Sequence, residues 1–274
     1  MLNRSLLFVP ALRPERVAKA VAAGADIVCI DLEDSVAPER KAEARDLAVA
    51  SLRAPPARAT LAVRINPIRG EEGPRDAAAL AAAGRKPAFV MLPKIEGVED
   101  VAEAGQRLGA AAAPIIAIIE TALGLENATA IARAVAPDGL LFFGAMDLSA
   151  ELGCALEWEP LIYARGRVIQ AAACAGIDAM DTPYPDIADE AGGIAEAKRA
   201  RSFGFTGKAA IHPKHIAGIH ATFTPSVAEI AWAKRVREAI GASSGVLQLD
   251  GKMIDRPVAR AAERVLGIAQ RLGL

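Results

Sequence analysis

The stretch IIAIIETALGLENATAIARAVAPDGLLFFGAMD, residues 115–147, decides the fold. It begins with one apolar run, Ile115–Ile119, and closes with a second, Leu140–Phe143, and an alanine-rich segment separates them. Continuous apolar runs of this length are typical of strands buried on both faces, as in parallel sheets. The segment between the runs is long enough for the helix that must cross over between two parallel strands. The stretch therefore predicts a strand–helix–strand unit.

The same pattern recurs along the chain, where apolar runs followed by alanine-rich stretches return about every 20–40 residues. The predicted strands are Ser5–Val9, Asp26–Asp31, Thr60–Ile65, Phe89–Leu92, Ile115–Ile119, Leu140–Phe143, Ile177–Met180 and Lys208–Ile211. Eight parallel strands with intervening helices close into an α/β fold, the (β/α)8 TIM barrel. An open doubly wound sheet would favour a glycine-rich phosphate loop after its first strand. The first run is followed instead by PALRP, and the sequence contains no GxGxxG motif, so the barrel is favoured.

Composition and charge exclude several classes of protein. The 274 residues are 53% hydrophobic and carry a net charge of −1, which argues against nucleic-acid binding and against a polybasic membrane anchor. No apolar run reaches the roughly 18 residues that span a bilayer, and the N-terminal run lacks a small-residue cleavage site, so we expect a strand there rather than a signal peptide. Three widely spaced cysteines without a CxxC pair favour a cytoplasmic protein.

Charged and polar side chains follow the predicted strands where each strand ends. They are Asp31 with Glu33 and Asp34, Arg64 with Asn66, Lys94 with Glu96, Glu120 with Thr121, Asp147, Asp181 and His212. Barrel enzymes carry their chemistry at the carboxyl ends of several strands. Polar residues also occur wherever a buried strand reaches solvent, but so many charges on one rim are costly unless something binds there. This rim is the predicted functional site.

Glu120 and Asp147 are the predicted metal ligands. Each is expected directly at the end of an apolar strand, and the two strands are neighbours in the predicted barrel, so both carboxylates can share one cation. Two carboxylates that leave positions open for water or substrate suit Mg²⁺, and Mn²⁺ accepts the same hard oxygen ligands. The alternative is that one of the two carboxylates pairs with Arg64 or Lys94.

Arg64 ends the third predicted strand and is the predicted substrate-binding residue. Its planar guanidinium suits bidentate binding of a substrate carboxylate. Pairing with Glu33 or Asp34 is a compatible alternative, because an acidic neighbour would also orient the guanidinium. The chain's three histidines lack a metal-binding spacing, so His212 is expected to be a hydrogen-bonding residue of the rim.

The last fifty residues differ from the βα pattern. We expect a barrel domain over residues 1–223 and a C-terminal arm over residues 224–274 that packs on a neighbouring subunit. Within the arm, Ser226–Ile240 is predicted to be an amphipathic helix. The pair Asp250-Gly251 between short apolar runs predicts a hairpin.

Asp255 lies directly before a further predicted helix that opens at Arg256-Pro257 and runs to about Arg271. Two interpretations stay open for this carboxylate. An aspartate before a helix that starts with proline is typically an N-cap. On an arm that moves, the same side chain can act as an acid or base that reaches a site when a lid closes.

Nine segments, in order along nearly the whole chain, carry a family resemblance: LLFVPALRPER, DLEDSVAPERK, VRIN, LPKIE, IIETALG, FFGAMDLSAELG, DTPYPDI, GFTGKAAIHPKHI and KMIDRPV. With these segments the sequence resembles the citrate lyase β-subunit-like family of the HpcH/HpaI aldolase group. One departure is Ala11, where many members of that family carry glycine, and it bears on how the first loop approaches a ligand.

The resemblance implies a (β/α)8 barrel with a divalent metal, usually Mg²⁺, held by Glu120 and Asp147. It implies that Arg64 binds the carboxylate of a 2-keto acid. The hydroxyl and the adjacent carboxylate of the substrate would chelate the metal, which is a form of Lewis-acid catalysis.

The resemblance also bears on coenzyme A and on assembly. Lys19 and Arg16, the latter in the RPER segment, would approach coenzyme A, which is part of the substrate. The terminal helices would pack on adjacent subunits in a homotrimer or a dimer of trimers. Asp255 would then complete a neighbour's site as the catalytic acid/base.

The activity implied is that of a Mg²⁺-dependent carbon–carbon lyase. It would cleave a hydroxyacyl-CoA of the citryl-CoA or malyl-CoA type to acetyl-CoA, or a related acyl-CoA, and a 2-keto acid such as oxaloacetate or glyoxylate. Two alternatives stay open. The same site could hydrolyse the thioester as an acyl-CoA thioesterase, or the chain could be a β subunit that is active only within a citrate lyase complex.

Overall fold

The structure is a computed structural model that describes residues 3–57, 60–109, 112–241, 247–249 and 251–274. The chain divides into two compact units, residues 3–219 and residues 220–274. The division falls inside helix α10 (Ile216–Phe223), a few residues before the expected domain boundary. No helix of the described residues is long and apolar enough to cross a membrane.

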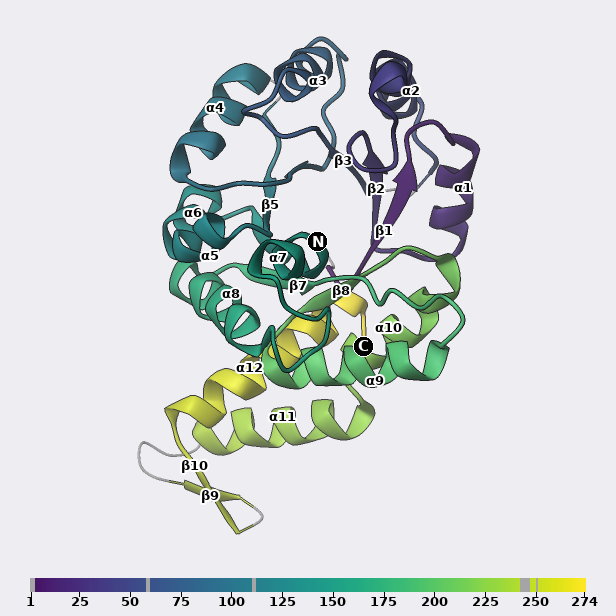
Figure 1. Ribbon diagram of the computed structural model, residues 1–274. Coiled ribbons are helices and arrows are strands. Elements are labelled where there is room, and N and C mark those ends of the chain that lie inside the picture. The colour runs from purple at the N-terminus through teal and green to yellow at the C-terminus, as the bar shows by residue number, and fades with distance from the viewer. Residues whose placement is uncertain (1–2, 58–59, 110–111, 242–246, 250) are drawn as a thin grey trace. The chain divides into compact units, whose positions relative to one another are not determined.

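Within the described residues of the first unit, eight parallel strands form a closed barrel in which β1 pairs with both β2 and β8 (Figure 1). The strands are β1 (Ser5–Pro10), β2 (Ile27–Asp31), β3 (Leu61–Arg64), β4 (Phe89–Leu92), β5 (Ile115–Ile119), β6 (Leu140–Phe143), β7 (Asp178–Asp181) and β8 (Gly207–Ala210). The predicted barrel is therefore confirmed, and the predicted strand ends are displaced by no more than one residue.

Helices surround the strands as an outer ring (Figure 1). They are α1 (Glu15–Ala22), α2 (Lys41–Arg53), α3 (Glu72–Ala81), α4 (Val98–Leu108), α5 (Ala122–Glu126), α6 (Ala128–Val135), α8 (Ile162–Ala175) and α9 (Glu190–Phe203). The short helix α7 (Ala145–Leu152) is drawn inside this ring in Figure 1. Alanine is the commonest residue at the buried positions of the ring helices, for example Ala44 and Ala48 on α2. Small side chains let the helices approach the strands closely and fill the space without voids.

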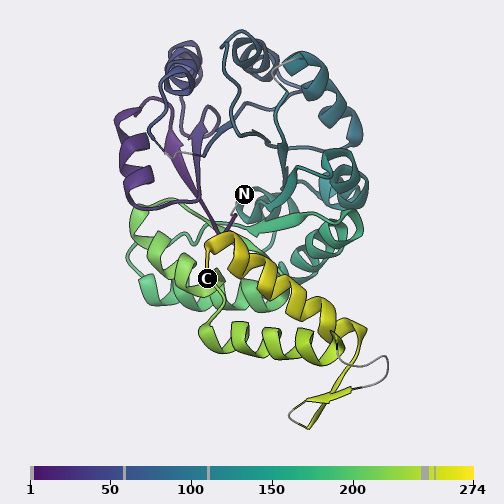
Figure 2. The same cartoon turned by 180° about the vertical axis from the view of Figure 1, so that it is seen from behind.

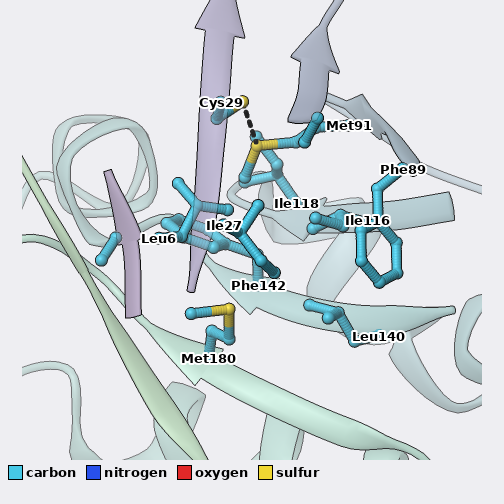
Figure 3. Close-up of a cluster of buried hydrophobic side chains, with 12 residues drawn as sticks. Leu6, Ile27, Cys29, Phe89, Met91, Ile116, Ile118, Leu140, Phe142 and Met180 are labelled. Atoms are coloured by element: carbon cyan, nitrogen blue, oxygen red, sulfur yellow. Dashed lines mark hydrogen bonds between the residues drawn. The ribbon is translucent and has the colours of Figure 1, made fainter. Parts of the chain in front are cut away.

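The barrel interior is a packed apolar core rather than a channel (Figure 3). Each strand contributes at least one buried side chain; among the larger ones are Leu6, Ile27, Phe89, Met91, Ile116, Ile118, Leu140, Phe142 and Met180. In this core the thiol of Cys29 donates to the sulfur of Met91 at 3.7 Å. Burial raises the pKa of the Cys29 thiol, so it is an inert core residue rather than a nucleophile. The core supports the rim residues at the strands' carboxyl ends.

In the second unit, helices α11 (Val227–Gly241) and α12 (Arg256–Leu272) lie side by side (Figure 2). Between them, β9 (Leu247–Leu249) and β10 (Lys252–Ile254) pair in antiparallel register, which confirms the predicted hairpin. Asp250 of the predicted turn lies outside the described residues. The helices bury a small apolar cluster of Ala233, Val236, Ile254 and Ala262, against which Trp232, Leu249, Val258, Val265 and Leu266 pack.

Candidate active site

The carboxyl ends of the strands enclose a cavity of about 790 Å³. Cavities of this size hold small-molecule ligands and cofactors. Six of the predicted rim residues line it, namely Asp31, Asp34, Arg64, Glu120, Asp147 and His212. Apolar walls come from Phe8, Ile118 and Phe142. Arg16 and Lys19, both exposed on α1, border the same cavity. The structure thus brings the predicted metal, substrate and coenzyme A residues of the barrel to one cavity, whereas the other predicted rim residues do not line it.

Glu120 is fixed in a buried position directly after β5. It is only 6% exposed, and its Oε1 accepts the backbone N–H of Lys94 at 2.8 Å. Gly144 leaves the space for this side chain, because a Cβ at position 144 would lie 2.5 Å from the Cβ of Glu120 and 2.6 Å from its Oε2. Burial, together with the charges of Glu33 and Asp147, raises the pKa of Glu120 to about 8. A carboxylate placed in this way favours a nearby cation.

Asp147 does not end its strand, and in this respect the prediction is wrong. The chain turns at Gly144 after β6, so that Asp147 lies in the first turn of α7. Its side chain is 41% exposed, and its Oδ2 lies 2.9 Å from the ammonium of Lys94. The alternative pairing of one carboxylate with Lys94 is therefore the one that the structure contains. Because β5 and β6 are neighbours, the segments carrying Glu120 and Asp147 still start from adjacent strand ends.

Arg64 lies at the end of β3 with its guanidinium carbon 4.9 Å from the centre of the Phe8 ring. Its Nε and Nη2 donate to the two oxygens of Asp31 at 2.6 and 2.8 Å, and its Nη1 lies 2.9 Å from Glu33 and 3.1 Å from Asp34. Burial alone would lower the pKa of Arg64, but these carboxylates raise it. Pairing with Glu33 and Asp34 was foreseen, whereas the bidentate partner Asp31 was not.

The loop that carries these acidic side chains is held by its own hydrogen bonds. Asp31 accepts the backbone N–H groups of Glu33 at 2.9 Å and Ser35 at 3.2 Å. The ammonium of Lys41, at the start of α2, donates to the carbonyl oxygens of Leu32 at 2.8 Å and Glu33 at 2.7 Å. Because these hydrogen bonds hold the loop, its polar groups are already in position before a ligand arrives.

Lys94 has a larger part in the site than the sequence indicated. Its ammonium lies 2.6 Å from Oε1 of Glu33 and 2.9 Å from Oδ2 of Asp147. Burial would lower the pKa of Lys94, but its hydrogen bonds to Asp147 and Glu33 raise it, so the side chain stays charged. Its φ of 52° is in the left-handed region. Such a conformation is uncommon for residues other than glycine and is concentrated at functional sites.

Two further predicted residues have defined local roles. His212 caps the short 3₁₀ helix Pro213–His215, with its Nδ1 accepting the backbone N–H of Lys214 at 3.3 Å. In the second unit, Asp255 caps α12 by accepting the backbone N–H of Val258 at 3.2 Å, which confirms the N-cap interpretation. The expected role of Asp255 in a neighbour's site stays a prediction.

Asp181 was expected on the rim but is fully buried. It binds the ammonium of Lys208 at 2.8 Å and the Nε of Arg165 at 3.2 Å. Both cations come from elements distant in the sequence, so no local pattern revealed this pairing. Asp181 is therefore part of a structural ion-pair network.

The donor set fits a hard divalent cation. Within the described residues, no group of three or more His, Cys, Asp or Glu side chains is placed to hold a metal ion. Glu120 and Asp147 line the same cavity, and two carboxylates would leave the other positions of such a cation to water and substrate. Mg²⁺ prefers this arrangement, since it retains several waters and binds through one or two carboxylates.

Comparisons with known proteins identify relatives over nearly the whole chain. The family model described as HpcH/HpaI aldolase/citrate lyase matches residues 4–213, and one described as a C-C bond lyase of the TIM-barrel fold matches residues 162–274. The citrate lyase subunit beta of Escherichia coli strain K12 is 35% identical, over 99% of this chain and 95% of its own length. A citrate lyase subunit beta-like protein of Mycobacterium tuberculosis is 38% identical, over 95% of this chain and 93% of its own length.

A solved structure resembles the chain over almost its full length. The CitE protein of Mycobacterium tuberculosis, in complex with magnesium, acetoacetate and coenzyme A, superposes with a TM-score of 0.83. The two sequences are 36% identical, and the match covers 98% of each chain. Taken with the family model that spans most of the barrel, these matches show that the chain belongs to the HpcH/HpaI aldolase/citrate lyase family.

Proposed function

We propose that this protein is a Mg²⁺-dependent carbon–carbon lyase that cleaves the CoA thioester of a hydroxylated di- or tricarboxylic acid. The products would be acetyl-CoA, or a related acyl-CoA, and a 2-keto acid such as oxaloacetate or glyoxylate. One observation carries the proposal. A buried carboxylate, Glu120, and a second, Asp147, border the same cavity as a guanidinium that Asp31 holds in a fixed orientation.

Glu120 and Asp147 would hold the metal ion. When bound there, Mg²⁺ would supply Lewis acidity that polarises an oxygen of the substrate, an effect of several kcal/mol. The relative from Mycobacterium tuberculosis was solved with magnesium, acetoacetate and coenzyme A together, which supports a site of this kind.

Arg64 would bind the substrate carboxylate. Its Nε and Nη2 are committed to Asp31, and its Nη1 lies 2.9 Å from the buried Glu33 and 3.1 Å from Asp34. Because the Asp34 side chain is 63% exposed, this ion pair contributes little and can be exchanged for a carboxylate of the substrate. Asp31 would keep the guanidinium in place during that exchange, which fixes the keto-acid end of the substrate.

The cavity wall and its border suit the remainder of the substrate. Phe8, Ile118 and Phe142 exclude water from the neighbourhood of the reacting carbons, which strengthens the electrostatic contacts there. Arg16 and Lys19 are exposed cations on this border, where they would meet the phosphates of coenzyme A.

The proton transfer is assigned to Asp255 of another subunit. We propose that the arm, residues 224–274, packs on a neighbour in a homotrimer or a dimer of trimers. Asp255 would then protonate the carbon next to the thioester after cleavage, or remove that proton in the condensation direction.

A cytoplasmic location is proposed as well, since Cys29, Cys154 and Cys174 form no disulfide within the described residues.

The experiment is a product analysis with the purified protein. With Mg²⁺ and citryl-, malyl-, methylmalyl- or citramalyl-CoA, we expect an acyl-CoA and a 2-keto acid in equal amounts, and EDTA should abolish their release. Failure to cleave all four thioesters would contradict the lyase. Free coenzyme A with an intact hydroxy acid would identify a thioesterase instead, and activity only after addition of other citrate lyase subunits would identify a component of that complex.

A further inference from the structure

Lys94 joins three acidic side chains of the cavity region, and the proposed reaction does not yet use it. Its backbone N–H donates to Glu120 at 2.8 Å, and its ammonium bridges Glu33 at 2.6 Å and Asp147 at 2.9 Å. Two of these three partners are the carboxylates proposed to hold Mg²⁺. Lys94 therefore contacts both proposed ligands. Its backbone N–H binds Glu120, and its charged side chain pairs with Asp147.

The backbone around Lys94 is held in a defined shape. Asp100, which is 2% exposed on α4, accepts the N–H groups of Glu96 at 2.8 Å and Gly97 at 3.1 Å. This capping fixes the turn between β4 and α4 and supports the left-handed φ of 52° at Lys94. The turn directs the N–H of Lys94 toward Glu120, while its side chain extends to Asp147 and Glu33. A conformation that is unfavourable for a residue with a Cβ persists where surrounding contacts determine it.

We infer that Lys94 is a positioning residue that competes with Mg²⁺ for Asp147 and so sets the affinity of the site for the metal ion. The inference rests on the proposed function, which places the metal ion at Glu120 and Asp147. Without metal, the ammonium neutralises Asp147. A cation that binds Oδ2 of Asp147 must displace the ammonium from that oxygen, and Glu33 is the partner that retains Lys94 after the displacement.

The sign of the effect follows from charge. An ammonium beside Asp147 opposes a divalent cation both by occupying the oxygen and by like-charge repulsion. Because the Lys94 and Asp147 side chains are 39% and 41% exposed, solvent screens the pair, and the effect is that of a moderate ion pair. Removing the ammonium should therefore tighten Mg²⁺ binding rather than weaken it.

The test is a calorimetric titration of Mg²⁺ into the metal-free, full-length protein. Lys94→Met keeps the aliphatic stem and should bind Mg²⁺ about fivefold more tightly than the wild type. Lys94→Arg retains the charge and should stay within about twofold of the wild type. The matched control is Lys86→Met, which removes the same charge from an exposed position before β4, at the other end of that strand, and should leave the affinity unchanged.

A second variant tests the competition from the other side. Glu33→Gln removes the alternative partner of the ammonium, so Lys94 should bind Asp147 more firmly and Mg²⁺ affinity should fall. In the Lys94→Met background the same change should have a clearly smaller effect, because the competitor is absent. Equal effects of Glu33→Gln in both backgrounds would overturn the inference.

The outcomes separate this inference from the proposed function. If the wild type binds no Mg²⁺, the proposed metal site fails. If the wild type binds Mg²⁺ and Lys94→Met binds it equally or more weakly, only the competition fails, and Lys94 is then a structural residue. A gain in affinity for Lys94→Arg as large as that for Lys94→Met would also overturn it.

Discussion

Replacing Glu120 by glutamine should make the metal-free protein more stable at alkaline pH while it abolishes Mg²⁺ binding. The amide keeps an oxygen that can accept the N–H of Lys94, and it fits the space beside Gly144, but it carries no charge. In the wild type the same space holds a carboxyl group that is 6% exposed and that has Glu33 and Asp147 as acidic neighbours. Ionising this group without a cation is therefore unfavourable.

The magnitude follows from the pKa of Glu120, which rises from 4.5 to about 8 in the folded protein. Below pH 4.5 the carboxyl is protonated in both states and contributes nothing. Between pH 4.5 and 8 the unfolded chain ionises while the folded protein keeps its proton, so the free energy of unfolding falls as pH rises. In this interval each pH unit lowers the free energy of unfolding by about 1.4 kcal/mol. Because the loss nearly ends above pH 8, it amounts to about 3 kcal/mol between pH 6 and pH 9.

The assay is urea unfolding of both proteins in EDTA at pH 6 and pH 9. The wild type should lose about 3 kcal/mol more than Glu120→Gln over this interval, because other titrating groups contribute equally to both. Excess Mg²⁺ at pH 9 should stabilise the wild type and leave the variant unchanged, since a ligand stabilises only the state that binds it. An identical loss of stability in both proteins would refute the assignment of a raised pKa to Glu120.

Three further predictions concern single residues. Arg64→Lys keeps the charge but loses the two-pronged contact with Asp31, so calorimetry should show keto-acid binding weakened by about 1–3 kcal/mol; unchanged affinity would refute the role of the guanidinium. Asp255→Asn should leave the melting temperature intact, because asparagine is an equally good N-cap, and should suppress turnover; normal turnover would remove Asp255 from the mechanism. Gly144→Ala should displace Glu120 and weaken Mg²⁺ binding in a calorimetric titration. An unchanged Mg²⁺ dissociation constant would show that the close approach of Gly144 to Glu120 is not required.

The sequence predicted the barrel and most of the rim because both depend on local patterns. Apolar runs such as Ile115–Ile119 and Leu140–Phe143 mark strands buried on both faces, and the first of them is followed directly by Glu120. The carboxyl ends of parallel strands then meet at one face whatever the helices between them contain. For this reason the sequence predicts Arg64 and Glu120 on one rim, and both line the same cavity.

Other features of the site depend on geometry that residue types do not encode. Asp147 lies in a helical turn rather than at a strand end, and the chain at Gly144 passes so close to Glu120 that a Cβ there would clash with it. The left-handed backbone of Lys94 is supported by Asp100, which lies on the following helix. Asp181 is neutralised by Lys208 and Arg165, and neither is near it in the sequence. The contacts of Glu120 with Gly144 and of Asp181 with Lys208 and Arg165 are tertiary, and no local pattern announces them.

The central claim is that Glu120 and Asp147 bind one hard cation beside Arg64. A crystal grown with Mn²⁺ and oxaloacetate tests it directly, because anomalous scattering locates the metal ion without ambiguity. We expect a single anomalous peak within about 2.2 Å of one oxygen of Glu120 and one oxygen of Asp147, with the keto acid bridging the metal ion and the Arg64 guanidinium. A metal ion bound elsewhere, or a keto acid that does not contact Arg64, would contradict it.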